Sequence, residues 1–69
     1  MRRPIDPLAH DIREEIVMML EGRELTPADI RRELPAAPSQ ATVGYHLAVL
    51  ERARLVERIG GVCRLPQSP

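Results

Sequence analysis

The stretch ATVGYHLAVLERARLVERIGGV, residues 41–62, decides the fold because its periodicity changes partway along. Val43, Leu47 and Leu50 recur at three- and four-residue spacing, which is typical of one apolar stripe on a helix. The second half alternates apolar and charged residues, as a strand with one buried face does. Gly60-Gly61 then supplies the two residues with positive φ that a tight hairpin turn needs. The segment predicts a helix that leads directly into a two-stranded hairpin.

Two further helices are predicted upstream. Asp6-Pro7 is typical of a helix start, and Gly22 of a helix end. Thr26-Pro27 repeats the start signal, and Pro35 ends the second helix because the residue before a proline resists helical angles. Ser39 is expected to cap the third helix, which runs to about Ala53. The apolar stripes consist of Leu8, Ile12, Ile16, Met19 and Leu20 in the first helix and of Ile30 and Leu34 in the second.

The two-glycine turn also fixes the register of the hairpin. The expected pairs are Ile59 with Val62, Arg58 with Cys63, Glu57 with Arg64 and Val56 with Leu65. Val56, Cys63 and Leu65 then face the core, whereas Glu57 and Arg64 form a pair on the opposite face. The order of helix, helix, helix and hairpin predicts a mainly α-helical winged helix-turn-helix fold with a two- to three-stranded antiparallel sheet.

The length of the chain limits its function. The 69 residues allow one domain, which we place at residues 6–66, between a flexible basic tail at 1–5 and a short C-terminal tail at 67–69. Tyr45 is the only aromatic residue, so the core is aliphatic and a pocket that encloses a substrate is hard to build. We recognise no nucleophile–base–acid set and no glycine-rich phosphate loop. An enzyme is therefore rejected, and no cofactor is expected.

The cysteine and histidine content and the hydropathy of the chain exclude further kinds of site and location. Cys63 is the single cysteine, which excludes an internal disulfide, and it is expected to be a small buried hydrophobe. Cys63, His10 and His46 lack the spacing of metal ligands, so no metal site is expected. No apolar run approaches transmembrane length, and the start MRRPIDP lacks the apolar segment of a signal peptide. These features predict a cytoplasmic protein without membrane contact.

The charges are balanced overall but unevenly distributed. Residues 1–34 hold six Arg against eight acids, whereas residues 35–69 hold four Arg against two Glu, and the chain has no lysine. The positive half is the one expected to lie on a phosphate backbone. The exclusive use of arginine suits phosphate and guanine recognition, or it reflects a GC-rich genome.

Four segments carry a resemblance to a known family: DPLAHDIREEIVMMLEG, LTPADIRREL, SQATVGYHLAVLERARLVER and the hairpin. Over about residues 6–65 the chain resembles the winged helix-turn-helix domain of ArsR-like regulators of bacteria and archaea. The TVGYHLAVLE block is the most specific segment. The resemblance implies a prokaryotic transcriptional regulator that places its third helix in the major groove of double-stranded DNA and its wing on the backbone.

The chain departs from that pattern in four places. Gly44 stands where the family has serine, so one DNA-contacting hydroxyl is missing. Arg54 stands where the helix normally ends on glycine, at a position where a left-handed residue is costly for anything but glycine or asparagine. The wing is cut to a two-glycine tip, which weakens the expectation of deep minor-groove contact. The chain also stops after the wing, without the C-terminal helix through which such regulators commonly dimerise.

The expected DNA contacts lie on the outer face of the third helix and on the wing. That face centres on Tyr45 and Arg52, with Ala41 and Ala48 beside them. Gln40 and Thr42 lie near the N-terminal end, which usually reaches base edges. The complete set of expected DNA-binding residues is Ser39, Gln40, Thr42, Gly44, Tyr45, His46, Arg52, Arg58 and Arg64.

Several of these residues allow two interpretations. Gly44 permits either close approach to DNA or close packing of the second helix. His46 is either a locally hydrogen-bonded structural residue or a base contact. Arg58 and Arg64 either touch phosphates or are exposed strand residues. Arg2 and Arg3 either reach an adjacent groove or belong to a disordered tail.

The function predicted from sequence is a sequence-specific DNA-binding transcriptional regulator. One alternative is a winged-helix module for protein–protein contact, such as an antirepressor or adaptor, which the neutral charge and blunt wing favour. Another is a truncated module of a larger regulator. A weak homodimer through the first helix is a further expectation, since Met18 lies off the main apolar stripe.

Overall fold

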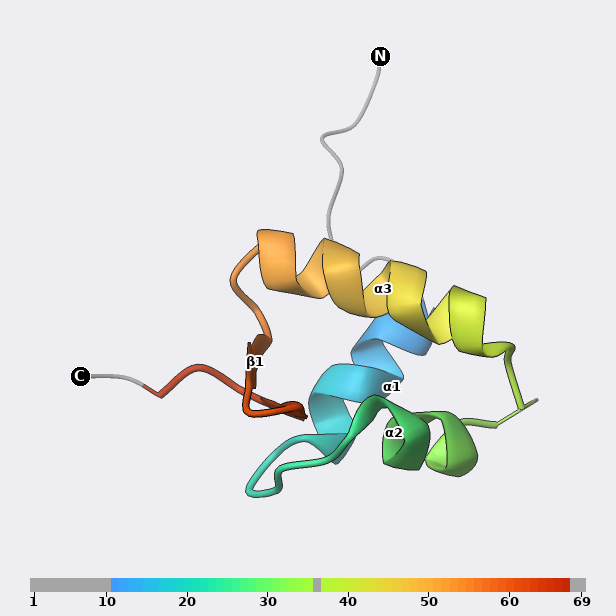
Figure 1. Cartoon of the computed structure of the whole chain (residues 1–69), viewed down its shortest axis with the longest axis horizontal. Helices are drawn as coiled ribbons and strands as arrows, with labels where there is room; N and C mark the ends of the chain where they lie inside the picture. Colours follow the sequence, from blue (N-terminus) through green and yellow to red (C-terminus); the bar gives the residue numbers. More distant parts are fainter. Residues whose placement is uncertain (1–10, 36, 68–69) are drawn as a thin grey trace, which may run out of the picture.

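The computed structural model describes residues 11–35 and 37–67. Three helices, α1 (Asp11–Met19), α2 (Pro27–Glu33) and α3 (Gln40–Arg52), are followed by strands β1 (Glu57–Ile59) and β2 (Val62–Arg64). The helices form one body with the hairpin at one end (Figure 1). The predicted winged helix-turn-helix fold is confirmed. The expected helix start at Asp6-Pro7, Leu8, His10 and both tails, apart from Gln67, lie outside the described residues.

The ends of α2 follow from its sequence. The Thr26 hydroxyl accepts a hydrogen bond of 3.1 Å from the backbone N–H of Asp29, which satisfies one of the donors at the helix start. Pro27 occupies the first helical position, where its missing N–H costs nothing. Leu34 has an extended ψ of 137° because Pro35 follows it. The chain then turns and enters α3 at Gln40.

The C-terminus of α3 is a Schellman motif built around an arginine. The N–H of Arg54 bonds the carbonyl of Glu51 at 3.0 Å, and the N–H of Leu55 bonds that of Leu50 at 2.9 Å. This geometry requires a left-handed residue, and Arg54 has a φ of 64°. An arginine thus adopts the left-handed conformation that glycine normally provides at this position. Leu55 packs against the core, and this contact fixes the direction in which the chain leaves α3 toward the wing.

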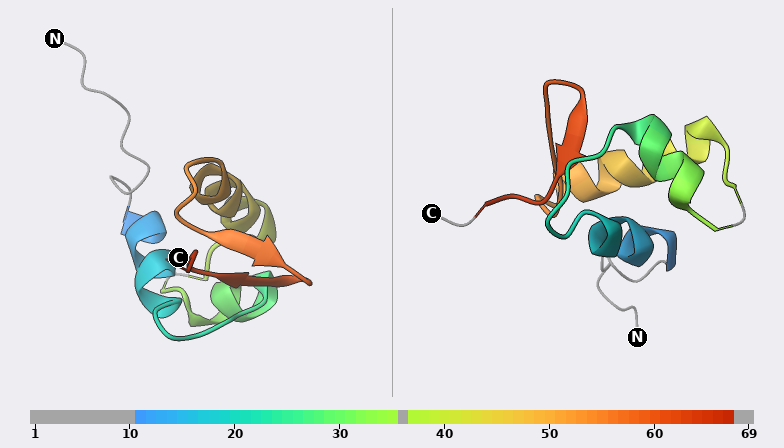
Figure 2. Two further views of the ribbon diagram at one scale, coloured as in Figure 1. Left: turned by 90° about the vertical axis from the view of Figure 1, so that its left-hand side faces the viewer. Right: turned by 90° about the horizontal axis from the view of Figure 1, so that it is seen from below.

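The hairpin has the predicted register, with Glu57 opposite Arg64, Arg58 opposite Cys63 and Ile59 opposite Val62. Gly60 and Gly61 both have positive φ, at 59° and 83°. A single bridge adds a third strand position to the hairpin: Leu25 pairs with Cys63 through two backbone hydrogen bonds of 3.0 and 2.7 Å. The bridge ties the wing to the segment between α1 and α2, and Figure 2 shows this segment beside the hairpin.

The core is aliphatic and draws on the three helices, β2 and the segments that join them. Its buried members are Ile16, Leu20, Leu25, Ile30, Leu34, Val43, Leu47, Leu50, Val56 and Cys63. The three inward residues predicted for α3 are among them, as is Cys63 at the centre of the hairpin. Because one face of α3 is fully committed to this core, its opposite face is presented to solvent.

Candidate nucleic-acid interface

The exposed face of α3 contains the stripe that the sequence predicted. Tyr45 is 60% exposed, and Ala41, Ala48 and Arg52 are exposed on the same side of the helix. The small alanines leave the helix backbone accessible, while Tyr45 and Arg52 project from it. A helix with this profile fits a groove in which two large side chains make the contacts.

Tyr45 forms a cluster with His46 of α3 and Arg13 of α1. Arg13 Nε donates a hydrogen bond of 3.1 Å to His46 Nδ1. The guanidinium carbon of Arg13 also lies 5.8 Å from the centroid of the Tyr45 ring, within range of a cation–π interaction. The Tyr45 and His46 rings meet edge to face, with centroids 5.2 Å apart. Arg13 therefore links α1 to the exposed face of α3.

His46, which the sequence placed among the expected DNA contacts, is nearly buried. Its side chain is only 5% exposed and accepts the bond from Arg13, so it belongs to the interior of the α1–α3 contact. A histidine beside an apolar stripe gives no sequence signal for such a partner, because Arg13 lies 33 positions away. These observations favour the structural interpretation of His46 over a base contact.

The N-terminal end of α3 combines capping with exposure. The Ser39 hydroxyl accepts the backbone N–H of Thr42 at 3.1 Å and donates to the Thr42 hydroxyl at 2.9 Å. Both hydroxyls thus serve the helix start. Gln40, the first residue of the helix, is exposed.

Gly44 does not serve the packing of the protein. A Cβ atom built at this position has no neighbour within 4 Å, which overturns the interpretation that α2 packs closely against it. Glycine inside a helix costs about 1 kcal/mol relative to alanine. The described structure therefore contains nothing that requires this glycine.

A cleft opens beside Gly44, where α2, α3 and the wing meet. Its volume is ≈ 380 Å³, and it is lined by Pro27, Ala28, Arg31, Gln40, Val43, Gly44, Leu47 and Arg58. Sequence reasoning placed Gln40, Gly44 and Arg58 at the interface but missed Arg31. The exposed face of α2 gave no reason to separate Arg31 from its neighbour Arg32.

The two wing arginines that the sequence assigned to phosphates are paired with carboxylates. Arg58 Nη2 lies 2.8 Å from Glu51 Oε2. Arg64 lies 3.0 Å from Glu57 and 3.5 Å from Glu24, and these acids raise the pKa of its guanidinium, the hydrogen bond to Glu57 most strongly. The predicted Glu57–Arg64 pair is confirmed. A phosphate contact by either arginine must compete with these carboxylates.

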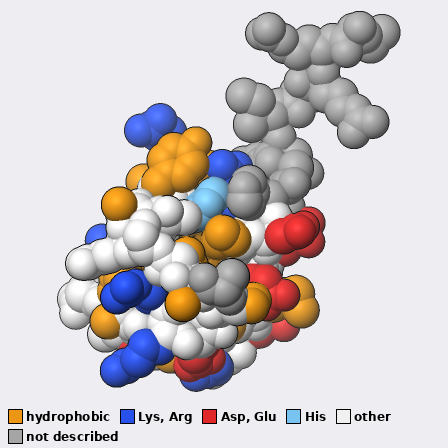
Figure 3. Space-filling model, turned by 90° about the vertical axis from the view of Figure 1, so that its right-hand side faces the viewer, with side chains coloured by type: hydrophobic (Ala, Val, Ile, Leu, Met, Phe, Trp, Pro, Cys, Tyr) orange, Lys and Arg blue, Asp and Glu red, His pale blue; other side chains and the backbone are white. Residues whose placement is uncertain are grey.

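The remaining arginines divide into two groups. Arg23 pairs with Glu33 through bonds of 3.0 and 2.8 Å, and Arg32 pairs with Asp29. Within residues 11–35 and 37–67, no ion pair joins Arg31, Arg52 or Arg54 to an acid. These three arginines supply the uncompensated positive charge of the described surface. Figure 3 shows acidic side chains gathered along one edge of the molecule and arginines toward the other.

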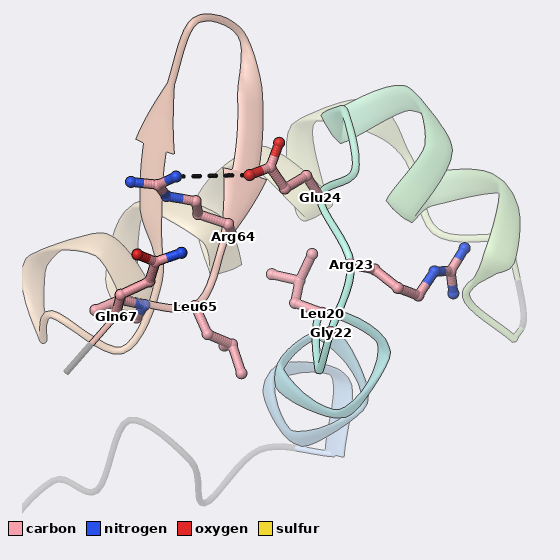
Figure 4. A pocket seen from close by; sticks show the side chains of 8 residues that line it. Leu20, Gly22, Arg23, Glu24, Arg64, Leu65 and Gln67 are labelled. Carbon is pink, nitrogen blue, oxygen red and sulfur yellow. Dashed lines mark ion pairs between the residues drawn. The ribbon is translucent and has the colours of Figure 1, made fainter.

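A larger cavity lies elsewhere, between the end of α1 and the end of the wing. It has a volume of ≈ 560 Å³ and is drawn in Figure 4. Leu20 and Leu65 point into it, whereas Arg64 turns toward Glu24 at the rim and Arg23 points away toward α2. Both arginines are paired, so the cavity brings together apolar side chains and satisfied charges.

The described residues contain neither a cluster of metal ligands nor a membrane-spanning helix. No group of three or more His, Cys, Asp or Glu among residues 11–35 and 37–67 could hold a metal ion. In those ranges no helix has the length and apolar character needed to cross a membrane.

Three helices, the second and third joined by a short turn, and a hairpin with a third strand position define a winged helix-turn-helix protein. A family model described as a helix-turn-helix domain matches residues 8–59. The chain belongs to this helix-turn-helix family, whose domains are in general the DNA-binding parts of regulators and are typically not enzymes. No similar curated protein and no similar solved structure was found.

Proposed function

We propose that this protein is a sequence-specific, ArsR-like regulator of transcription that binds double-stranded DNA through α3. Its proposed location is the cytoplasm of a prokaryote. The observation that carries the proposal is the exposed stripe of α3, where Tyr45 and Arg52 alternate with two alanines while the opposite face forms the core. Gln40 extends this surface at the helix start. The roles follow from chemistry: Gln40 and Tyr45 read or abut bases, and Arg52 holds a phosphate.

The charge distribution supports the same orientation. Arg31 and Arg52 lie on α2 and α3 and have no acidic partner among the described residues, so both can neutralise phosphates. The wing arginines contribute less, because Glu51 and Glu57 already bind them. The wing then contacts the backbone mainly through its short glycine tip.

Duplex selection followed by substitution tests this proposal. Gln40→Ala is expected to weaken binding to the selected site by about 1–3 kcal/mol and to relax the preference at one base position. Tyr45→Ala is expected to weaken the specific complex more than the non-specific one. Arg52→Ala should weaken all sequences similarly and reduce the salt slope by about one unit. If both Gln40→Ala and Tyr45→Ala bind every duplex as the parent does, α3 is not the recognition helix.

A protein-interaction module is the second candidate, and one observation favours it. Four arginines of the described surface are paired with acids, which lowers the positive charge available for DNA. This candidate predicts no duplex binding at low salt. DNA affinity that falls steeply as salt is added would exclude it.

A further inference from the structure

The cleft between α2, α3 and the wing combines an apolar floor with polar rims. Val43 and Leu47 are buried residues of the core that also line it, and Gly44 contributes bare backbone. Arg31 stands on the α2 side and Arg58 on the wing side. The cleft thus lies beside the exposed stripe of α3, on the side of the helix that faces α2 and the wing.

Gly44 indicates that the cleft has an occupant. The residue is not among the glycines with positive φ, so no turn requires it. A Cβ atom would meet nothing within 4 Å, so no packing requires it either. Glycine weakens a helix, and its remaining use is to let another molecule approach the backbone closely. The space left by the missing side chain is therefore best explained by a ligand.

The charges around the cleft define the chemistry of that ligand. The side chain of Arg31 is held by a hydrogen bond of 3.0 Å from its Nε to the carbonyl of Pro38, and no ion pair joins it to an acid among the described residues. Arg58 forms the opposite rim, but Glu51 lies 2.8 Å from it. One uncompensated cation above an apolar floor suits a group that joins an anion to a compact apolar ring. A deoxyribose with its phosphate has this composition.

We infer that the cleft seats one sugar–phosphate unit of a DNA strand, with the sugar over Gly44 and the phosphate at Arg31. This inference rests on the proposed function and adds the path of one strand across the protein. That strand passes between α2 and the wing, and the Tyr45–Arg52 stripe enters the groove beside it. Gly44 and Arg31 are thereby assigned to backbone contact, which positions the protein and carries no sequence preference.

Filling the cleft tests the inference with variants that keep the fold. Gly44→Ala and Gly44→Leu introduce good helix formers at an open position, so their urea midpoints should equal or exceed that of the parent. Duplex affinity, measured by fluorescence polarisation, should fall for all sequences in both variants. For Gly44→Leu the affinity should fall about tenfold, which is the scale of one lost contact. A stabilised protein with reduced affinity is the expected signature.

Two neighbouring arginines of α2 provide a matched control. Arg31→Gln should reduce affinity for all duplexes and lower the salt slope by about one unit. Arg32→Gln removes the same charge one residue away, but Arg32 pairs with Asp29 and does not line the cleft. The salt dependence of duplex affinity should therefore equal that of the parent. Hydroxyl-radical footprinting of the parent should show a protected sugar on one strand, and Gly44→Leu should lose that protection.

The outcomes separate the inference from the proposed function. If the parent binds DNA and Gly44→Leu binds equally well with the same sugar protection, the cleft is not the backbone site and the proposed function stands. A lowered urea midpoint for both Gly44 variants also overturns the inference, since the glycine then serves the fold. A parent that binds no duplex at low salt overturns both, and the cleft is left to an apolar side chain of a protein partner.

Discussion

Arg54 has a strained backbone conformation at the C-terminus of α3, just before the wing. Its φ of 64° places a side chain with a Cβ atom in the left-handed region, which costs L-residues roughly 1–2 kcal/mol. The Schellman hydrogen bonds of Arg54 and Leu55 hold it there. The sequence indicated that a left-handed residue would be costly at this position, and the structure shows that Arg54 is left-handed.

Arg54→Gly is expected to raise the free energy of unfolding by about 0.5–1 kcal/mol, since glycine adopts positive φ without a steric penalty but loses more entropy on folding. Urea unfolding measures the change. Ala53→Gly is the matched control: Ala53 has a right-handed φ of −81°, so the same substitution should lower stability. Equal effects at both positions would contradict the strain at Arg54.

Tyr45 provides a spectroscopic test of the Arg13 cluster. It is the only aromatic residue of Phe, Trp and Tyr type, so the near-ultraviolet circular dichroism signal reports this ring alone. Arg13→Gln removes the cation near the ring and the bond to His46, and the ring should gain rotational freedom. We expect the near-ultraviolet signal to fall while the far-ultraviolet spectrum persists. Arg52→Gln, which is exposed on the same helix, should leave both spectra unchanged.

At the scale of elements, local rules predicted what lies close in sequence and missed what folding brings together. The Gly60-Gly61 turn fixed the hairpin register because two residues leave only one way to pair the strands. The Leu25–Cys63 bridge and the Arg13–His46 bond join distant segments, and no periodicity announces such pairs. The pairing of Arg58 with Glu51 was missed for the same reason. The helices and their caps were therefore predictable, whereas the ion pairing of the interface arginines was not.

The wing depends on docking, since its strands have three residues each and an isolated hairpin is marginal in water. Cys63 reports this docking: it is fully buried, and burial raises the pKa of its thiol. We expect iodoacetamide to modify the native protein far more slowly than the urea-unfolded chain, because the thiolate is the reactive form and the buried sulfur is inaccessible. Equal rates in native and unfolded protein would show that the wing detaches freely.

The ion pairs of α2 make the free energy of unfolding depend on pH in the acidic range. The Thr26 hydroxyl first, and the Arg32 guanidinium second, hold the pKa of Asp29 below its usual value, and a hydrogen bond from Arg23 lowers the pKa of Glu33. A carboxyl with a lowered pKa contributes stability above its unfolded pKa and loses it as the pH falls through the folded value. The free energy of unfolding should therefore decline between about pH 5 and pH 2.

The Asp29→Asn, Glu33→Gln double variant should show a shallower decline, measured by urea unfolding across this range. Both pairs are exposed, so added salt should reduce the difference between the variant and the parent. Parallel curves for the two proteins would mean that these carboxyls do not contribute.

At the scale of the whole molecule, charge separates the surfaces. The exposed side of α1 presents Asp11, Glu14, Glu15 and the apolar Met18. Arg31, Arg52 and Arg54, which form no ion pair with an acid among residues 11–35 and 37–67, lie on α2, on α3 and directly after α3. A neutral protein can therefore direct its positive side toward DNA and keep α1 away from it. A single winged helix also has a small contact surface, which favours pairing of two copies on one site.

We propose that two copies associate weakly through α1, where Met18 is 62% exposed. A two-fold contact there brings Glu14 and Glu15 of one copy near the same residues of the other. Like charges oppose the contact, so added salt should strengthen association in sedimentation equilibrium, whereas it weakens DNA binding. Met18→Glu should abolish association. Ile59→Glu, at the exposed end of β1, removes a comparable apolar side chain and should leave it intact. A strict monomer at high salt, together with a footprint that lacks two-fold symmetry, would exclude this dimer.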